Sequence, residues 1–183
     1  TFGYTAALPQ IPKGCGVNYL VTQKIFWSYN EGEQFPYHYF TWQGMDGSEI
    51  DSFLPTSYTY RTHPSEVNKI WKNRVQVQDL DAFLLPFGYG DGGGGPTRDF
   101  IESAKRQEDL EGGVKVKMAG PLEFFHDMEA QGGPANTYVG ELYFSAHRGT
   151  YTSQAMVKQN NRRCELALRE MEMWSTLAMN KGM

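Results

Sequence analysis

Cysteine is scarce in this chain, since Cys15 and Cys164 are its only two and lie far apart in the sequence. They cannot build a disulfide framework or a cysteine-rich zinc motif. No run of about 18 apolar residues occurs, so no segment is expected to span a membrane. Basic residues are not in excess: 17 Lys and Arg stand against 21 Asp and Glu. A nucleic-acid surface needs clustered positive charge. We therefore expect a soluble protein from a reducing compartment, with neither a nucleic-acid nor a membrane partner.

The chain does contain enough apolar residues for a folded core, 40% of its 183 positions. Its length suits one ordinary domain or a part of something larger. The first residue is Thr1, not Met, and the last amphipathic segment has no partner helix after it. An amphipathic helix buries its apolar stripe against another element. We therefore expect a piece of a longer chain.

Strand and helix patterns alternate along the sequence. Short apolar or aromatic runs predict strands at residues 16–22, 38–44, 49–54, 80–87, 114–118 and 138–146. Amphipathic stretches predict helices at residues 64–75, 97–110, 121–128 and 152–179. This alternation predicts an α/β architecture with a largely parallel sheet.

A glycine-rich stretch, GYGDGG at residues 88–93, satisfies the dinucleotide-binding pattern G-x-G-x-x-G. Further glycines and Pro96 separate it from the next helix, whereas a pyrophosphate must lie on the helix N-terminus. Asp91 would also place a carboxylate among the phosphates. A phosphate loop fails too, because no Lys and Ser/Thr follow the glycines. Two alternatives remain: a flexible surface loop with a solvated aspartate, or a bare loop that lets a polar ligand approach one carboxylate.

Longer stretches around this loop resemble the α-mannosidases of glycoside hydrolase family 38, in particular the vacuolar and cytosolic type and its bacterial relatives. The resemblance covers essentially the whole chain. It is carried by FGYTAALPQI at residues 2–11, WQGMDGS at 42–48, PFGYGDGGGGPTR at 86–98, GELY at 140–143 and HRGTYTSQ at 147–154. It implies the C-terminal part of a (β/α) barrel-like catalytic domain in residues 1–140. The first helix of a helical-bundle middle domain would follow in residues 141–183.

The same resemblance implies a zinc-dependent retaining exo-α-mannosidase that removes terminal α-linked mannose from oligosaccharides. In such enzymes one carboxylate attacks the anomeric carbon, a second carboxyl protonates the leaving oxygen, and the metal holds sugar hydroxyls. By this likeness Asp91 is the general acid/base and His147 a ligand of Zn²⁺ or another divalent ion. Phe2 stacks on the sugar, and Tyr60 and Arg148 contact the substrate.

Part of that machinery falls outside the chain. The family's nucleophilic aspartate would directly precede Thr1, and no upstream His-x-Asp pair of zinc ligands occurs. We therefore expect the isolated chain to be inactive and to need the rest of its catalytic domain as a partner. The alternative is a non-catalytic carbohydrate-binding or scaffold module. The sequence is compatible with a monomer or a homo-oligomer, and with a cytoplasmic or a vacuole- or lysosome-like compartment.

Several of these assignments have plainer alternatives. Without the resemblance, His147 is more readily a surface histidine, and Phe2 could equally be a core aromatic, as could Tyr60. The remaining histidines have no carboxylate or thiol partner at ligand spacing, so we expect structural roles for them. These are His38, His63 and His126.

Overall fold

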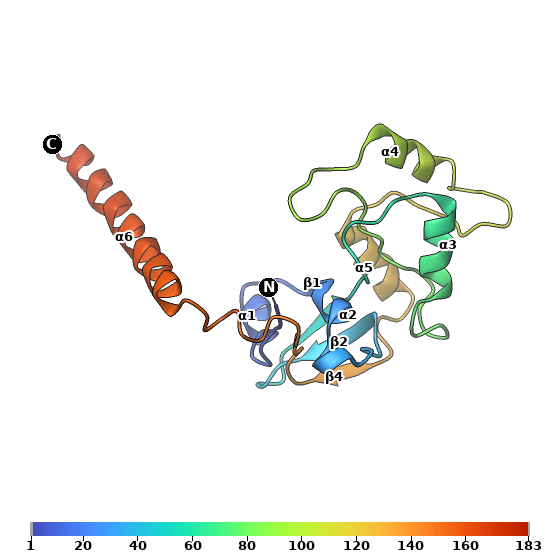
Figure 1. The fold of residues 1–183 in the computed structure, drawn as a ribbon, viewed down its shortest axis with the longest axis horizontal. Coiled ribbons are helices and arrows are strands. Elements are labelled where there is room, and N and C mark those ends of the chain that lie inside the picture. Colours follow the sequence, from blue (N-terminus) through green and yellow to red (C-terminus); the bar gives the residue numbers. More distant parts are fainter. Residues whose placement is uncertain (1, 183) are drawn as a thin grey trace. The chain divides into compact units, whose positions relative to one another are not determined.

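The computed structural model describes residues 2–182. The chain divides into two compact units, of which unit 1 is Thr1–Ala146 and unit 2 is His147–Met183 (Figure 1). Unit 1 contains a sheet with several short helices, and unit 2 is dominated by one long helix. The predicted α/β class is confirmed for unit 1.

The sheet of unit 1 has four strands in the order β1-β3-β2-β4. Strands β2 and β3 form an antiparallel hairpin, whereas β1 pairs with β3, and β4 with β2, in parallel. The prediction of a largely parallel sheet is confirmed for two of the three strand pairs. The β2–β3 pair is antiparallel, because the tight turn at residues 44–48 returns the chain directly alongside β2. The strands are β1 (Tyr19–Val21), β2 (Tyr39–Gln43), β3 (Glu49–Phe53) and β4 (Thr137–Val139).

Both faces of the sheet are apolar, because side chains alternate along β2 and β3. Phe40 and Trp42 of β2 face a first cluster, and Tyr39 faces a second. The buried residues of the first cluster are Ile25, Phe35, Phe40, Trp42, Ile50, Leu54, Leu142 and Phe144. Those of the second are Tyr39, Phe53, Leu80, Phe124, Phe125 and Met128.

Several short helices complete unit 1. His63 and Pro64 start α3 as predicted, since the His63 imidazole accepts a hydrogen bond from the Ser65 amide at 3.3 Å. Helix α5 contributes three buried side chains to the second cluster, those of Phe124, Phe125 and Met128. The helices of unit 1 are α1 (Gln10–Gly14), α2 (Lys24–Trp27), the 3₁₀ turn η1 (Asn30–Gly32), α3 (Pro64–Lys72), α4 (Arg98–Lys105) and α5 (Pro121–Ala130).

Two predicted strands are wrong. Residues 80–87 and 114–118 run as irregular segments, and the first pairs only through an isolated bridge between Phe87 and Tyr60. Both segments line a cavity of about 550 Å³ together with side chains of α3, α4 and α5. Their apolar residues therefore line a cavity from irregular segments, and a run of apolar residues cannot distinguish this arrangement from a strand.

Two further elements are shorter than predicted. The helix expected over residues 97–110 ends at Lys105. The strand expected over residues 138–146 is reduced to β4 and isolated bridges at Leu142 and Phe144. Gly140, with φ of 127°, breaks the extended conformation directly after β4.

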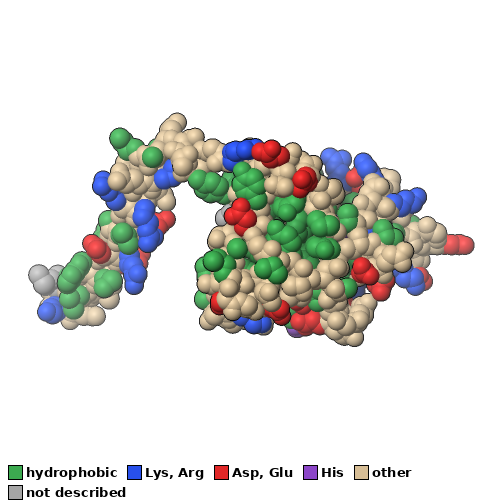
Figure 2. Space-filling model, turned by 90° about the horizontal axis from the view of Figure 1, so that it is seen from below, with side chains coloured by type: hydrophobic (Ala, Val, Ile, Leu, Met, Phe, Trp, Pro, Cys, Tyr) green, Lys and Arg blue, Asp and Glu red, His purple; other side chains and the backbone are tan. Residues whose placement is uncertain are grey.

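Unit 2 contains α6 (Ala155–Asn180), close to the predicted helix. None of its described residues is buried, and Figure 2 shows hydrophobic and charged side chains exposed along it. The predicted role of its apolar stripe in a helical bundle stays a prediction, as does the barrel. Within residues 2–182, no helix combines the length and apolar character needed to cross a bilayer.

Candidate active site

The loop at residues 88–95 presents Asp91 to solvent. Its turn is closed by hydrogen bonds from the Tyr89 amide to the Gly94 carbonyl at 3.0 Å and from the Gly93 amide to the Gly90 carbonyl at 2.9 Å. Asp91 has a φ of 55° and is exposed. Aspartate is one of the few residues that adopt this left-handed conformation readily. The loop therefore fixes the backbone at Asp91 while leaving the carboxylate accessible.

Tyr58, on the segment that follows β3, meets this carboxylate. The Tyr58 hydroxyl donates a hydrogen bond to Oδ1 of Asp91. The two segments can approach because Gly90 has no side chain: a Cβ there would lie 2.3 Å from ring carbons of Tyr58. Gly90 is thus required for close packing of the loop.

Lys24, the first residue of α2, also contacts Tyr58. Its ammonium group donates a hydrogen bond to the Tyr58 hydroxyl at 3.1 Å. It also lies 4.7 Å from the centre of the Tyr58 ring, 5.5 Å from that of Phe2 and 5.6 Å from that of Trp27. These distances are typical of cation–π contacts. A single positive charge is therefore surrounded by three aromatic rings beside the Asp91 loop.

Phe144 anchors two of these rings to the core. Its ring centre lies 5.7 Å from that of Phe2 and 5.2 Å from that of Trp27. Phe144 itself is buried in the first cluster. The structure thus brings together Phe2 and Asp91, two residues predicted for the site: Phe2 lies beside the Lys24 ammonium group, and Asp91 accepts a hydrogen bond from Tyr58.

Tyr60 lies on the same segment as Tyr58 but points inward. It is buried, its hydroxyl hydrogen-bonds the Thr56 hydroxyl, and desolvation raises its pKa above the usual value of 10. Its carbonyl accepts a hydrogen bond from the Gly88 amide at 3.2 Å, which ties it to the start of the Asp91 loop. The predicted contact of Tyr60 with substrate stays a prediction.

His147 and Arg148 are the first residues of unit 2. The His147 carbonyl accepts a hydrogen bond from the Thr150 amide at 2.9 Å, in a turn that precedes α6. The His147 side chain is half-buried and Arg148 is exposed. Their predicted roles in metal and substrate binding stay predictions.

A zinc site is not complete within the described residues. Among residues 2–182, no three or more His, Cys, Asp or Glu side chains gather closely enough to hold a metal ion. A structural zinc has four protein ligands and a catalytic zinc has three. The residues present therefore do not by themselves fit the metal that the resemblance implies.

The other histidines make contacts within unit 1. His38 is fully buried, with Nδ1 2.6 Å from the Leu54 carbonyl and its ring stacked 4.1 Å from that of Phe26. Burial lowers the pKa of His38 from 6.5 to about 4. His63 caps α3, and the His126 ring meets the Tyr19 ring edge-on.

Sequence reasoning did not find Lys24, Trp27 and Tyr58. They come from two segments whose proximity to the Asp91 loop is produced by the tertiary fold, and no local spacing signals it. The run of glycines was the available clue, because a residue without a Cβ often marks a close approach of another segment.

Two family matches divide the chain. Residues 1–141 match the family described as "Glycosyl hydrolases family 38 N-terminal domain". The chain belongs to glycosyl hydrolase family 38. Residues 145–183 match the family described as "Alpha mannosidase middle domain". The resemblance found in the sequence motifs is thereby confirmed.

Curated proteins similar to this family 38 chain carry the name α-mannosidase. "Alpha-mannosidase 2C1" of Homo sapiens is 40% identical over all of the chain, which covers 18% of that protein. "Alpha-mannosidase G" of Dictyostelium discoideum is 41% identical over 94% of the chain, and "Alpha-mannosidase" of Saccharomyces cerevisiae is 36% identical over 94%. The chain spans less than a fifth of the length of these relatives.

Proposed function

We propose that this chain is part of a retaining exo-α-mannosidase that removes terminal α-linked mannose from oligosaccharides. The observation that carries the proposal is the convergence of Phe2 and Asp91 around Lys24 and Tyr58. An exposed carboxylate beside aromatic rings suits a sugar, which offers apolar ring faces for stacking and hydroxyls for hydrogen bonds. The names of the relatives support mannose as the sugar.

Asp91 is the general acid/base in this proposal. Tyr58 occupies Oδ1, which leaves Oδ2 to carry a proton toward the leaving glycosidic oxygen. In a retaining enzyme a second carboxylate attacks the anomeric carbon, and the first then deprotonates the incoming water. We assign that nucleophile to an aspartate directly before Thr1, as the family resemblance implies. Phe2 then lies two positions from the nucleophile and next to the sugar ring.

Part of the metal site would lie in unit 2. We assign His147 as one ligand of a Zn²⁺ site completed by residues outside this chain, and Arg148 and Tyr60 as further substrate contacts. Zinc supplies a template and a positive charge for sugar hydroxyls when it is bound.

The decisive experiment compares Asp91→Asn with the unaltered enzyme in the intact protein that contains this chain. Loss of the general acid removes a contribution of about 10²–10⁴-fold to the rate. We expect that loss on an aryl α-mannoside, with product of retained configuration from the unaltered enzyme by NMR. Asp109→Asn is the matched control, since Asp109 is an exposed aspartate paired with Lys115 at 3.0 Å.

Two results would contradict the proposal. Full activity of Asp91→Asn would remove Asp91 from the mechanism. An intact protein that binds mannosides without hydrolysing them would instead support the carbohydrate-binding or scaffold module. The 183-residue chain alone should be inactive in the same assay, because it contains neither the proposed nucleophile nor the other metal ligands.

A further inference from the structure

We infer that Lys24 and Tyr58 are positioning residues for the proton-donating carboxyl of Asp91. The inference rests on the proposed α-mannosidase function and goes beyond it, because it assigns roles to two residues that act through Asp91 and not on the sugar. It is carried by a directed chain of hydrogen bonds between α2, the segment after β3 and the glycine-rich loop.

The direction of these two hydrogen bonds follows from the chemistry of the donors and acceptors. An ammonium group has only protons to donate, so the 3.1 Å contact must run from Lys24 Nζ to the Tyr58 oxygen. The phenolic proton of Tyr58 is then directed to Oδ1 of Asp91. The order is therefore Lys24 to Tyr58 to Asp91, and each donor holds the next group in one orientation.

Aromatic packing holds Lys24, the first donor in this series of hydrogen bonds, in place. Three ring centres lie within 5.6 Å of its ammonium group. Cation–π contacts of this kind stabilise a lysine that is partly withdrawn from water. Ile25, the next residue of α2, is fully buried in the first cluster and anchors the helix.

Packing of the glycine-rich loop fixes Asp91, the last group in this series of hydrogen bonds. The absent Cβ of Gly90 lets the loop lie against Tyr58 and Thr59, where a methyl group would come within 2.3 Å of side-chain carbons. Asp91 follows directly with its backbone in the left-handed conformation. The carboxyl group is thus aimed by its own backbone and by the Tyr58 hydroxyl together.

This arrangement assists proton transfer in a defined way. The proton leaves Oδ2 of Asp91 for the glycosidic oxygen, which also takes the electron pair of the breaking bond to the anomeric carbon. That carbon bonds to the nucleophilic carboxylate, and Asp91 is left as a carboxylate. The Tyr58 hydrogen bond strengthens as charge develops on Asp91, because hydrogen bonds to charged acceptors are the stronger ones. Tyr58 and Lys24 keep their protons throughout.

The test measures kcat and KM of Tyr58→Phe and Lys24→Met in the intact protein on two mannosides. A dinitrophenyl leaving group departs without protonation, whereas an alkyl leaving group needs the acid. We expect kcat/KM on the alkyl mannoside to fall about 10- to 100-fold, a part of the full contribution of a general acid. We expect kcat/KM on the dinitrophenyl mannoside to change by less than about threefold, because kcat/KM reports departure of the leaving group and not the later hydrolysis of the glycosyl-enzyme, in which Asp91 acts as the base.

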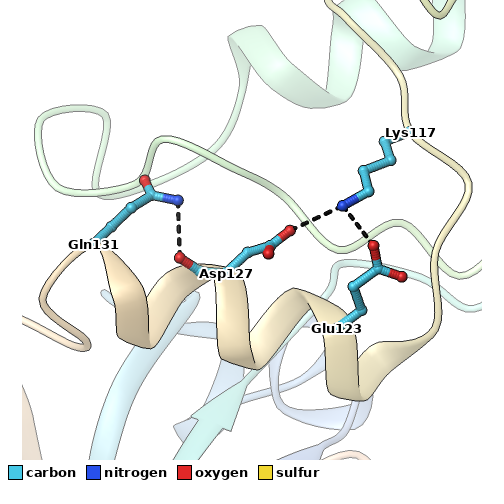
Figure 3. Close-up of polar contacts among 4 residues, drawn as sticks. All are labelled: Lys117, Glu123, Asp127 and Gln131. Carbon is cyan, nitrogen blue, oxygen red and sulfur yellow. Dashed lines mark hydrogen bonds and ion pairs between the residues drawn. The ribbon is translucent and has the colours of Figure 1, made fainter.

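Two variants elsewhere in unit 1 serve as matched controls. Tyr19→Phe removes the 2.8 Å hydrogen bond that the Tyr19 hydroxyl donates to the Glu129 carboxylate. Lys117→Met removes the ion pairs of Lys117 with Glu123 and Asp127, at 2.5 and 3.2 Å, which Figure 3 shows together beside α5. Neither group lies in the proposed site, so both variants should keep kcat/KM on both substrates.

The outcomes separate this inference from the proposed function. If Asp91→Asn shows the leaving-group dependence but Tyr58→Phe and Lys24→Met do not, the positioning role is wrong and the mannosidase proposal stands. If Asp91→Asn shows no such dependence, the proposed function fails with it. An equal loss on both substrates in Tyr58→Phe indicates a purely structural role and also overturns the inference. Lys24→Met leaves the tyrosine intact and decides the question if Tyr58→Phe does not fold.

Discussion

Gly90 shows how a single missing methyl group shapes the site. A Cβ at this position would meet the Tyr58 ring and the Thr59 methyl group at 2.3 Å. We expect Gly90→Ala to push the loop away from Tyr58, to destabilise the protein by about 1–3 kcal/mol as overpacking does, and to lower mannosidase activity. Urea unfolding and aryl mannoside hydrolysis measure the two effects.

Gly95→Ala is the control for this substitution. Gly95 belongs to the same loop, but a Cβ there would have no neighbour within 4 Å and the backbone is not in the left-handed region. It should be close to neutral in stability and activity. If Gly95→Ala is as damaging as Gly90→Ala, flexibility of the loop and not contact with Tyr58 explains the effect.

His38 makes stability depend on pH. Burial lowers its pKa from 6.5 to about 4, so between these values the unfolded chain binds a proton that the folded chain does not. Stability therefore rises with pH across this window and is lost as pH falls from 6.5 toward 4, by about 3 kcal/mol in total. Urea unfolding at several pH values measures the slope.

The His38→Gln variant should flatten that slope, whatever its effect on stability at neutral pH. His126→Gln should keep it, because His126 is exposed on α5. An unchanged slope in His38→Gln would show that another group causes the loss of stability in acid.

At the scale of elements, the β2–β3 hairpin depends on its turn. Gly47 has a φ of 84° with no atom near a would-be Cβ, so an alanine there is strained by conformation alone. We expect Gly47→Ala to cost about 1 kcal/mol and to lower Tm by several degrees. Gly14→Ala, at the end of α1 in equally open space, should leave Tm unchanged or raise it. Equal effects of the two substitutions would contradict this account.

Elements with a chemical start signal were predictable from the sequence. The helices α3 and α5 begin at Pro64 and Pro121, where the sequence marked them. The apolar runs at residues 80–87 and 114–118 carried no such signal, and irregular segments that line a cavity produced the same pattern as a strand. The parallel pairing of β4 with β2 joins distant segments, which local periodicity does not encode.

The residues of the candidate site also fall into two groups, those that the sequence predicted and those that it did not. Asp91 and Phe2 were found because motifs shared with a family extend around them. Lys24 and Tyr58 were missed because their functional neighbour is another side chain brought close by folding. A hydrogen bond between residues 24 and 58 leaves no trace in the spacing of residue types.

At the scale of the whole protein, we predict that metal removal abolishes activity. Chelation of the intact protein should stop aryl mannoside hydrolysis, and added Zn²⁺ should restore it. His147→Ala should lower the bound zinc, measured by atomic absorption. His63→Ala, which removes the side chain that caps α3, should keep the zinc. Full zinc content in His147→Ala would remove His147 from the ligands.

Strands β2 and β3 belong to both apolar clusters at once, since each contributes buried side chains to either face of the sheet. Neither cluster can open without breaking the same ladder of backbone hydrogen bonds, so the two should exchange their amide hydrogens as one cooperative unit. Lys24 precedes a buried residue of this unit, and Tyr58 follows β3 closely. Lys24 and Tyr58, which orient Asp91, are thus attached to the cooperative unit formed by the sheet and its two clusters. We expect the orientation of the Asp91 carboxyl to be lost only when this unit unfolds.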